Sequence, residues 1–162
     1  MLKQLLAAVL LSCSFAAAQT ATGPPETVLA GIDLRHTTIA AIQKLYGQQD
    51  AMYAVPPDPY PQGTKLYKWG RLTVTLRVLT EPSPQGEVIK AVQVEGQGEP
   101  NDKPINKTGR GLKLSAKASE INKIYGREPS GAETKIQWPD GTILIVTLND
   151  KQRVGKLELR AP

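Results

Sequence analysis

Residues 31–47 read Gly31-Ile-Asp-Leu-Arg-His-Thr-Thr-Ile-Ala-Ala-Ile-Gln-Lys-Leu-Tyr-Gly47, and with one residue deleted they return as Gly111-Leu-Lys-Leu-Ser-Ala-Lys-Ala-Ser-Glu-Ile-Asn-Lys-Ile-Tyr-Gly126. Further along, Leu72-Thr-Val-Thr-Leu76 returns as Leu144-Ile-Val-Thr-Leu148. A repeated order of segments is typical of a duplicated supersecondary unit. We therefore predict two tandem units, which are joined by a spacer rich in turn residues. Their bounds are 28–96 for the first unit, 97–110 for the spacer and 111–162 for the second unit.

Each unit is predicted to begin with a short helix. In the first unit Thr37 or Thr38 can cap the helix, and the apolar residues between Ile39 and Tyr46 recur at helical spacing. In the second unit Ser115 is the expected cap. Both helices end in Tyr-Gly, where glycine suits a left-handed C-terminal residue. Two to three turns are too few for an isolated helix to be stable, so each helix is expected to pack on a sheet.

Strand signals follow each helix. Alternating apolar and polar residues over 72–78 predict a strand with one face in water, whereas 142–148 is apolar on both faces and predicts a more central strand. Trp138-Pro-Asp-Gly141 predicts a hairpin turn. Each unit therefore indicates a helix and three antiparallel strands, an α+β fold with the helices on one face of the sheet. The strands are expected to form either one continuous sheet or two small sheets side by side. The other expected strands are 66–69, 88–95, 136–138 and 154–159, and 80–86 is expected to be a long hairpin loop.

The first unit carries an insertion, residues 51–62, that has no counterpart after Gly126. Its four prolines favour an extended polyproline conformation. Because an insertion in one copy is where duplicated units diverge, its aromatic residues are candidates for partner contact. Two tryptophans occupy matching places in the repeat, either as core residues or as a concave aromatic contact surface. The candidate partner-binding residues are Tyr53, Pro57, Tyr60, Trp69 and Trp138.

The N-terminus has the pattern of a secretory signal peptide over residues 1–18. Lys3 is followed by an apolar region too short to span a bilayer, and Ala16-Ala17-Ala18 offers a cleavage site. Residues 19–27 are then expected to form a polar, flexible tether. A second interpretation is a bacterial lipoprotein signal ending at Cys13, which would carry the lipid. The sequence therefore predicts an extracytoplasmic protein, either periplasmic or secreted, with lipid anchoring at Cys13 as the alternative.

Composition limits the classes of function. Cys13 is the only cysteine and His36 the only histidine, so neither a disulfide nor a Cys/His metal cluster can form within the mature chain. We expect no metal and no cofactor. The formal charge of +5 falls to +4 when Lys3 is removed, and the charges are interspersed. This surface is either ordinary or suited to anionic envelope polymers and lipids. Nucleic acid is not an expected partner, because no helix carries a basic stripe with stacking aromatics.

The sequence contains few candidate catalytic residues, but they are compatible with a hydrolase. His36 could act as a general base beside Asp33, although it reads as a loop residue. No serine lies in a Gly-x-Ser-x-Gly elbow. A carboxylate pair is the other possibility, although its members read as a solvated loop. The serines that could join His36 are Ser83, Ser115, Ser119 and Ser130, and the clustered acids are Glu95, Glu99 and Asp102.

The order of elements resembles the beta-lactamase-inhibitor-protein-like fold, shared with small outer-membrane assembly lipoproteins of the SmpA/OmlA type. The resemblance rests on a helix end at Gly126-x-Glu128-Pro129 and on the aromatic strands Tyr67-x-Trp69 and Ile136-x-Trp138. The helices here end in Tyr-Gly where that family has Leu-Gly. Members of the family generally bind proteins or the envelope through the exposed sheet, and most are not enzymes. The resemblance thus implies a binding module.

Three functions follow from the sequence. The first is a non-enzymatic, extracytoplasmic module that docks a protein or envelope component through its open sheet face and the 51–62 loop. The second is a small secreted hydrolase that uses His36 or a carboxylate pair. The third is an electrostatic binder of anionic envelope polymer or lipid, whose binding would weaken as salt is raised. The partner and the oligomeric state do not follow from the sequence.

Overall fold

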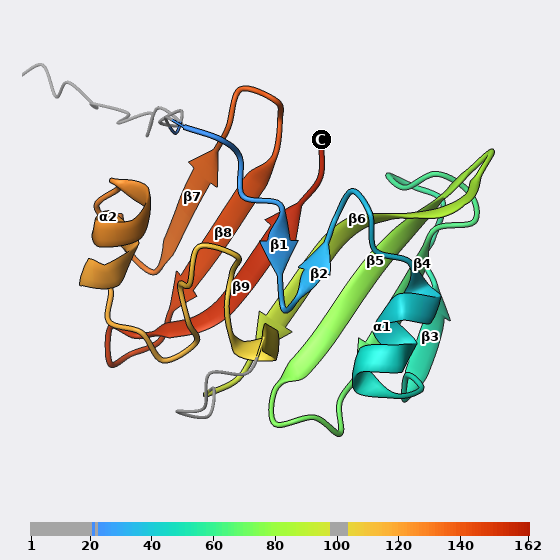
Figure 1. Ribbon diagram of the computed structural model, residues 1–162, viewed down its shortest axis with the longest axis horizontal. Helices are drawn as coiled ribbons and strands as arrows, with labels where there is room; N and C mark the ends of the chain where they lie inside the picture. The colour runs from blue at the N-terminus through green and yellow to red at the C-terminus, as the bar shows by residue number, and fades with distance from the viewer. Residues whose placement is uncertain (1–20, 22, 98–103) are drawn as a thin grey trace, which may run out of the picture.

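The computed structural model describes residues 21, 23–97 and 104–162. Its main element is an antiparallel sheet with the strand order β3-β4-β5-β6-β9-β8-β7, and β1 and β2 form a separate two-stranded sheet (Figure 1). The strands are β1 Val28–Leu29, β2 Ile32–Asp33, β3 Ala51–Ala54, β4 Lys65–Trp69, β5 Thr75–Ser83, β6 Gly86–Glu95, β7 Glu133–Gln137, β8 Ile143–Leu148 and β9 Val154–Arg160. The helices are α1 Ile39–Tyr46, α2 Ser119–Tyr125 and the short 3₁₀ helix η1 Pro104–Asn106.

The prediction of two α+β repeats, each a helix with three strands, is wrong. Strand and bridge residues make up 41% of the described residues and helices only 13%. Four strands follow α1 and three follow α2, and β6 pairs with β9 so that all seven strands belong to one sheet. The physical reason is that the apolar residues of these two strands, such as Val92 and Leu159, bury their side chains by pairing with each other across the supposed boundary.

One face of the seven-stranded sheet forms the core. A row of paired residues runs across it from β4 to β7, and nearly all its side chains are fully buried. Burial of this apolar surface is the main stabilising contribution to the fold. The row consists of Tyr67, Val78, Val92, Leu159, Leu144 and Ile136.

The cover over this core face combines short helices with extended chain. In Figure 1 α1, the β1–β2 pair and η1 lie in front of the sheet, and α2 lies beside β7 at the left edge. Each element contributes at least one buried apolar side chain, and isolated bridges such as Leu29–Thr108 tie the extended segments together. The opposite surface of the sheet carries no such layer among the described residues, and we call it the open face. The buried side chains of the cover include Leu29, Ile32, Ile42, Ile105 and Ile121.

The helix ends agree only in part with the prediction. Thr38 caps α1 by accepting a hydrogen bond from the Ala41 N–H at 3.2 Å. Gly126 takes the predicted left-handed conformation, whereas Gly47 has a positive φ but an extended ψ of −173°. Ser115 does not cap α2, because α2 begins later, at Ser119. The Ser115 N–H instead donates to the Val154 carbonyl of β9 at 2.7 Å, from a turn in which Ser115 has a φ of 65°.

The predicted strands over 88–95, 142–148 and 154–159 and the turn at 138–141 are confirmed. Two segments that were expected to be loops contain strand. The insertion begins with β3, an edge strand paired to β4, and residues 80–83 extend β5 to a tight turn before Gly86. Both segments can pair because their prolines avoid the ladder positions that need an N–H group.

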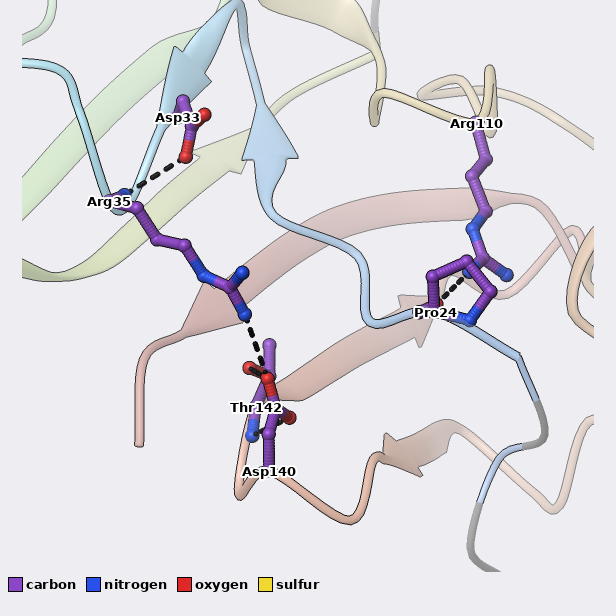
Figure 2. A network of polar contacts seen from close by, with 6 residues as sticks. All are labelled: Pro24, Asp33, Arg35, Arg110, Asp140 and Thr142. Atoms are coloured by element: carbon purple, nitrogen blue, oxygen red, sulfur yellow. Dashed lines mark hydrogen bonds and ion pairs between the residues drawn. The ribbon is translucent and has the colours of Figure 1, made fainter.

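The segment predicted as a flexible tether, 19–27, is packed against the protein where it is described. Ala21 is buried, and its N–H donates to the Gln137 carbonyl at the end of β7 at 2.7 Å. Pro24 accepts a hydrogen bond from the Arg110 guanidinium (Figure 2). The predicted signal peptide, residues 1–18, lies outside the described residues. Within the described part of the chain no helix combines the length and apolar character needed to cross a membrane.

Glu26 anchors this segment to the core. It is 3% exposed and accepts hydrogen bonds from the Tyr125 hydroxyl at 2.9 Å, the Arg110 N–H at 3.1 Å and the Val28 N–H at 3.3 Å. The Tyr125 hydroxyl also bonds Thr108 at 2.8 Å. Burial and the neighbouring Glu26 carboxylate raise the pKa of Tyr125 far above its usual range. A buried carboxylate with three donors is thus an attachment point between the N-terminal segment and α2.

A second polar bridge joins the cover to the β7–β8 turn of the large sheet. Arg35, just after β2, forms an ion pair with Asp140 at 2.9 Å, and Asp140 also accepts from Thr142 in the β7–β8 turn (Figure 2). The Arg35 N–H donates to Asp33. The pair is largely exposed, so its contribution to stability is small.

Candidate docking site on the open face

The open face contains a hollow of about 240 Å³. Four strands of the large sheet form its floor, and the loop that follows β3 forms one wall. The hollow joins an apolar half and a polar half that come from successive rows of paired residues. The apolar residues are Val55, Tyr60, Leu66, Leu79 and Ala91, and the polar residues are Arg77, Gln93 and Glu158.

The apolar half is set by strand register. Leu66 of β4 pairs with Leu79 of β5, and Leu79 pairs with Ala91 of β6. Because side chains alternate between the two faces of a strand, this register places all three on the open face. All three are half-buried, so part of their apolar surface faces water. A partly exposed apolar row on a sheet face is a surface that gains from being covered.

The polar half lies one row further along the same strands. Arg77 pairs with Gln93, and Gln93 with Glu158 of β9. The Arg77 guanidinium donates to Glu95 at 2.9 Å, and Glu158 accepts from Arg160 at 2.5 Å. Among the described residues these are the side-chain bonds of Arg77 and Glu158, so Arg77 keeps N–H donors for a guest. The hollow can therefore bind an apolar group that has a hydrogen-bond acceptor beside it.

The proline-rich insertion forms one wall of this hollow. Two of its residues, Val55 and Tyr60, line the hollow. The Val55 N–H donates to the Thr64 carbonyl at 3.0 Å, which closes the base of the loop. Tyr60 is 38% exposed and lines the hollow, whereas Pro57 is exposed and does not line it. The insertion and the open face, which were predicted to act together, thus meet at one site.

Tyr53 lies elsewhere on the same edge. It belongs to β3, is 51% exposed, and pairs with Leu66, so its side chain shares the open face. It does not line the hollow. Its neighbour Met52 is 53% exposed on the other face of the same strand. This edge strand is consequently a second exposed apolar feature of the first half of the chain.

The two tryptophans are core residues and cannot form a surface for contact. Trp69 and Trp138 are each 1% exposed. Trp69 donates from its indole N–H to the Gly47 carbonyl at the end of α1, at 2.9 Å. Trp138 packs edge-on against Tyr125 and beneath the Arg110 guanidinium, which lies 5.7 Å from its ring centre. The two tryptophans therefore hold matching positions in the sequence because each packs in the core beside one of the two helices.

His36 lies on the surface, away from the hollow. Its Nδ1 atom is 2.9 Å from Asp33 Oδ2, and its side chain is 79% exposed. Burial acts to raise the pKa of Asp33, but the hydrogen bonds from His36 and the Arg35 N–H outweigh it and lower that pKa. In the described part of the chain no serine hydrogen-bonds His36. The serines considered were Ser83, Ser115, Ser119 and Ser130.

The clustered acids do not form a described pair. Glu99 and Asp102 lie outside the described residues, and Glu95 is bonded to Arg77. Among the residues that the structure describes, no group of three or more metal-binding side chains is found. A larger hollow of about 540 Å³ is lined by Gln97, Ser115 and the β8–β9 turn from Asn149 to Arg153. It consists of polar loop residues without an apolar row, so it lacks the feature that distinguishes the open-face hollow.

Sequence reasoning missed most of the residues that line the open-face hollow. One local signal was present. Leu79 lies on the same side of its strand as Thr75 and Arg77, so it is an apolar residue on the face that was expected to be in water. The remaining residues come together only through pairing between distant strands. Comparisons of this chain with protein-family models, with curated proteins and with solved structures find no match. The resemblance to the beta-lactamase-inhibitor-protein-like fold therefore stays a prediction.

Proposed function

We propose that this chain is an extracytoplasmic, non-enzymatic binding module that docks a segment of a partner protein in the open-face hollow. The observation that carries the proposal is the half-buried row Leu66, Leu79 and Ala91, which is walled by Tyr60 of the insertion. Extracytoplasmic location rests on the signal-type N-terminus of the sequence.

The size of the hollow favours a docked chain over a free small molecule. Sites for drug-sized ligands usually enclose roughly 300–1,000 Å³. At about 240 Å³, the hollow suits one or two side chains of a longer segment, whose backbone would lie across the sheet. The acceptor that Arg77 favours would then be a carboxylate or carbonyl next to the apolar anchor.

The charges in and beside the hollow favour a specific partner over an anionic polymer. Arg77 and Arg160 are both paired with acids of the same face, Glu95 and Glu158. Paired cations contribute less to a long-range positive potential than a continuous basic patch does. The hydrolase alternative gains no support from His36, because Asp33 bonds it but no serine of the described residues does.

The proposal is tested by capture from envelope extract with the full chain as bait, at low and high salt. The wild type is compared with Ala91→Trp, which fills the hollow, and Tyr60→Ala, which removes its wall. Val88→Ser is the matched control, because Val88 is 41% exposed on β6 but does not line the hollow. We expect one protein in near-equal amount to survive high salt, to be lost with both hollow variants and to be retained by the control.

Three results would contradict the proposal. Capture that is equal for the wild type and both hollow variants would place the contact elsewhere. Capture of lipid or polymer alone, lost at high salt, would favour the electrostatic binder. A bait that captures nothing while turning over an ester or glycoside substrate would favour the hydrolase. Circular dichroism of each variant checks that Ala91→Trp and Tyr60→Ala remain folded.

A further inference from the structure

The edge strand β3 has an unpaired side that the docking hollow does not use. It pairs with β4 on one side and with no described strand on the other. Its residues are Ala51, Met52, Tyr53 and Ala54, which include no charge and no proline. Met52 and Tyr53 are each more than half exposed. Natural edge strands usually carry charges, prolines or bulges that prevent pairing with another chain.

The other edge of the same sheet has those protections. β7 carries the exposed charges Glu133 and Lys135, and Ala21 bonds the carbonyl of Gln137 at its end. Its register places both charges on the open face. The two edges of one sheet therefore differ: β7 is blocked and charged, whereas β3 is open and apolar.

The backbone direction of β3 follows from its register. Residues of β3 and β4 pair as Ala51–Lys68 through Ala54–Lys65, and the Val55 N–H donates to the Thr64 carbonyl in the same register. In an antiparallel ladder, hydrogen-bonded and non-bonded pairs alternate. Ala51, Tyr53 and Val55 therefore direct their N–H and C=O groups toward β4. Met52 and Ala54 direct theirs outward.

We propose that β3 pairs with β3 of a second copy of this chain, antiparallel and centred on Tyr53. In this register Met52 of each copy lies opposite Ala54 of the other, and their outward groups form four hydrogen bonds. A register centred on Ala54 would place Pro56, which has no N–H, opposite Met52. A register centred on Met52 would require Asp50, whose N–H already donates to Lys68.

Charge favours a second copy as the occupant. The strand itself is neutral, and the nearest acid, Asp50, is bonded by the Arg71 side chain at 2.9 Å, so the paired strands bring no like charges directly opposite each other. Tyr53 meets its own counterpart as a non-bonded pair on the open face, where aromatic cross-strand pairs are favourable. Each copy keeps the floor of its hollow, which consists of residues from β4, β5, β6 and β9. The pairing therefore goes beyond the proposed function and does not depend on it.

The direct test is a disulfide at the centre of the pairing, in the full chain with Cys13→Ser so that no other thiol is present. Non-bonded antiparallel partners have Cα atoms about 4.5 Å apart, within the range a disulfide spans. Tyr53→Cys should oxidise to a covalent dimer. Ala51→Cys is the matched control: its counterpart would be about 14 Å away, so it should stay monomeric.

The second test leaves the central residue unchanged. Ala54→Pro removes an N–H that points away from β4, so the fold is retained while two of the four bonds between copies are lost. Sedimentation up to about millimolar concentration should find a weak, concentration-dependent dimer, as a short interface allows. The variant should weaken it roughly 30-fold. A wild type that stays monomeric throughout, equal cross-linking of Tyr53→Cys and Ala51→Cys, or an unaffected Ala54→Pro dimer would overturn the proposal.

Discussion

Replacing Glu26 tests whether the N-terminal segment belongs to the folded core. Glu26→Ala removes the acceptor of three donors, of which the Tyr125 hydroxyl is the most buried. A hydrogen bond to a charged group contributes about 1.5–3 kcal/mol, and the part-buried Arg110 N–H adds about 1 kcal/mol. The 3.3 Å bond from Val28 adds little, and Tyr125 can still donate to Thr108. We expect a net loss of about 2–4 kcal/mol in the free energy of unfolding.

The magnitude is measured by urea unfolding at pH 7, with an unchanged m-value as the sign that only stability has altered. For a chain of this length the loss corresponds to roughly 6–12 °C in Tm. Glu26→Gln keeps one carbonyl oxygen and should lose about half as much. Glu120→Ala is the control, because Glu120 has only a surface pair with Lys123 at 3.8 Å. A Glu26→Ala variant within about 0.5 kcal/mol of wild type would refute the anchoring.

Three further changes have expected outcomes in the same unfolding assay. Trp69→Phe should lower the free energy of unfolding by about 1 kcal/mol more than Trp138→Phe. The reason is that the Trp69 indole N–H donates to a carbonyl at 2.9 Å, whereas that of Trp138 has no partner among the described residues. Equal losses of stability in the two variants would contradict this. Burial acts to raise the pKa of Glu87, but the hydrogen bonds from Lys65 and Tyr67 outweigh it and lower that pKa below 4.5. The contribution of Glu87 to the free energy of unfolding is therefore present above pH 4.5 and lost as the pH falls through the lowered pKa. Glu87→Gln should therefore lose less stability than wild type on acidification below pH 4.5, and parallel curves would contradict this. Gly126→Ala should cost about 1–2 kcal/mol, because φ is 66° with open space around the position, and a neutral substitution would mean that the turn relaxes.

Local signals in the sequence predicted the elements better than their arrangement. A threonine cap at position 37 or 38 and the strands over 88–95 and 154–159 were predicted, because capping and alternation depend on neighbouring residues. Whether the strands form one sheet or two stayed open at the level of sequence, because β6 and β9 pair across more than sixty residues and no local pattern encodes that choice. Ser115 was misplaced for the same reason: its N–H bonds to Val154 of β9, a partner far along the chain.

The candidate site was predicted in outline only. The insertion and the open face were both identified, because an unmatched segment and a polar alternation are visible in the sequence. The hollow itself depends on register, since Leu66, Leu79 and Ala91 become neighbours only when three strands are aligned. Trp69 and Trp138 remained ambiguous because a large aromatic residue suits a core and a contact surface equally well, and only burial distinguishes the two.

The most direct test of the central claim is site-specific photo-cross-linking in intact cells. A photoreactive p-benzoylphenylalanine is placed at Leu79, inside the hollow, and separately at Val88, which is exposed on β6 outside it. If the hollow docks a partner protein, position 79 will give one adduct of defined mass, position 88 will not, and Ala91→Trp will abolish the adduct. No adduct at position 79, or the same adduct from both positions, would contradict docking in the open-face hollow.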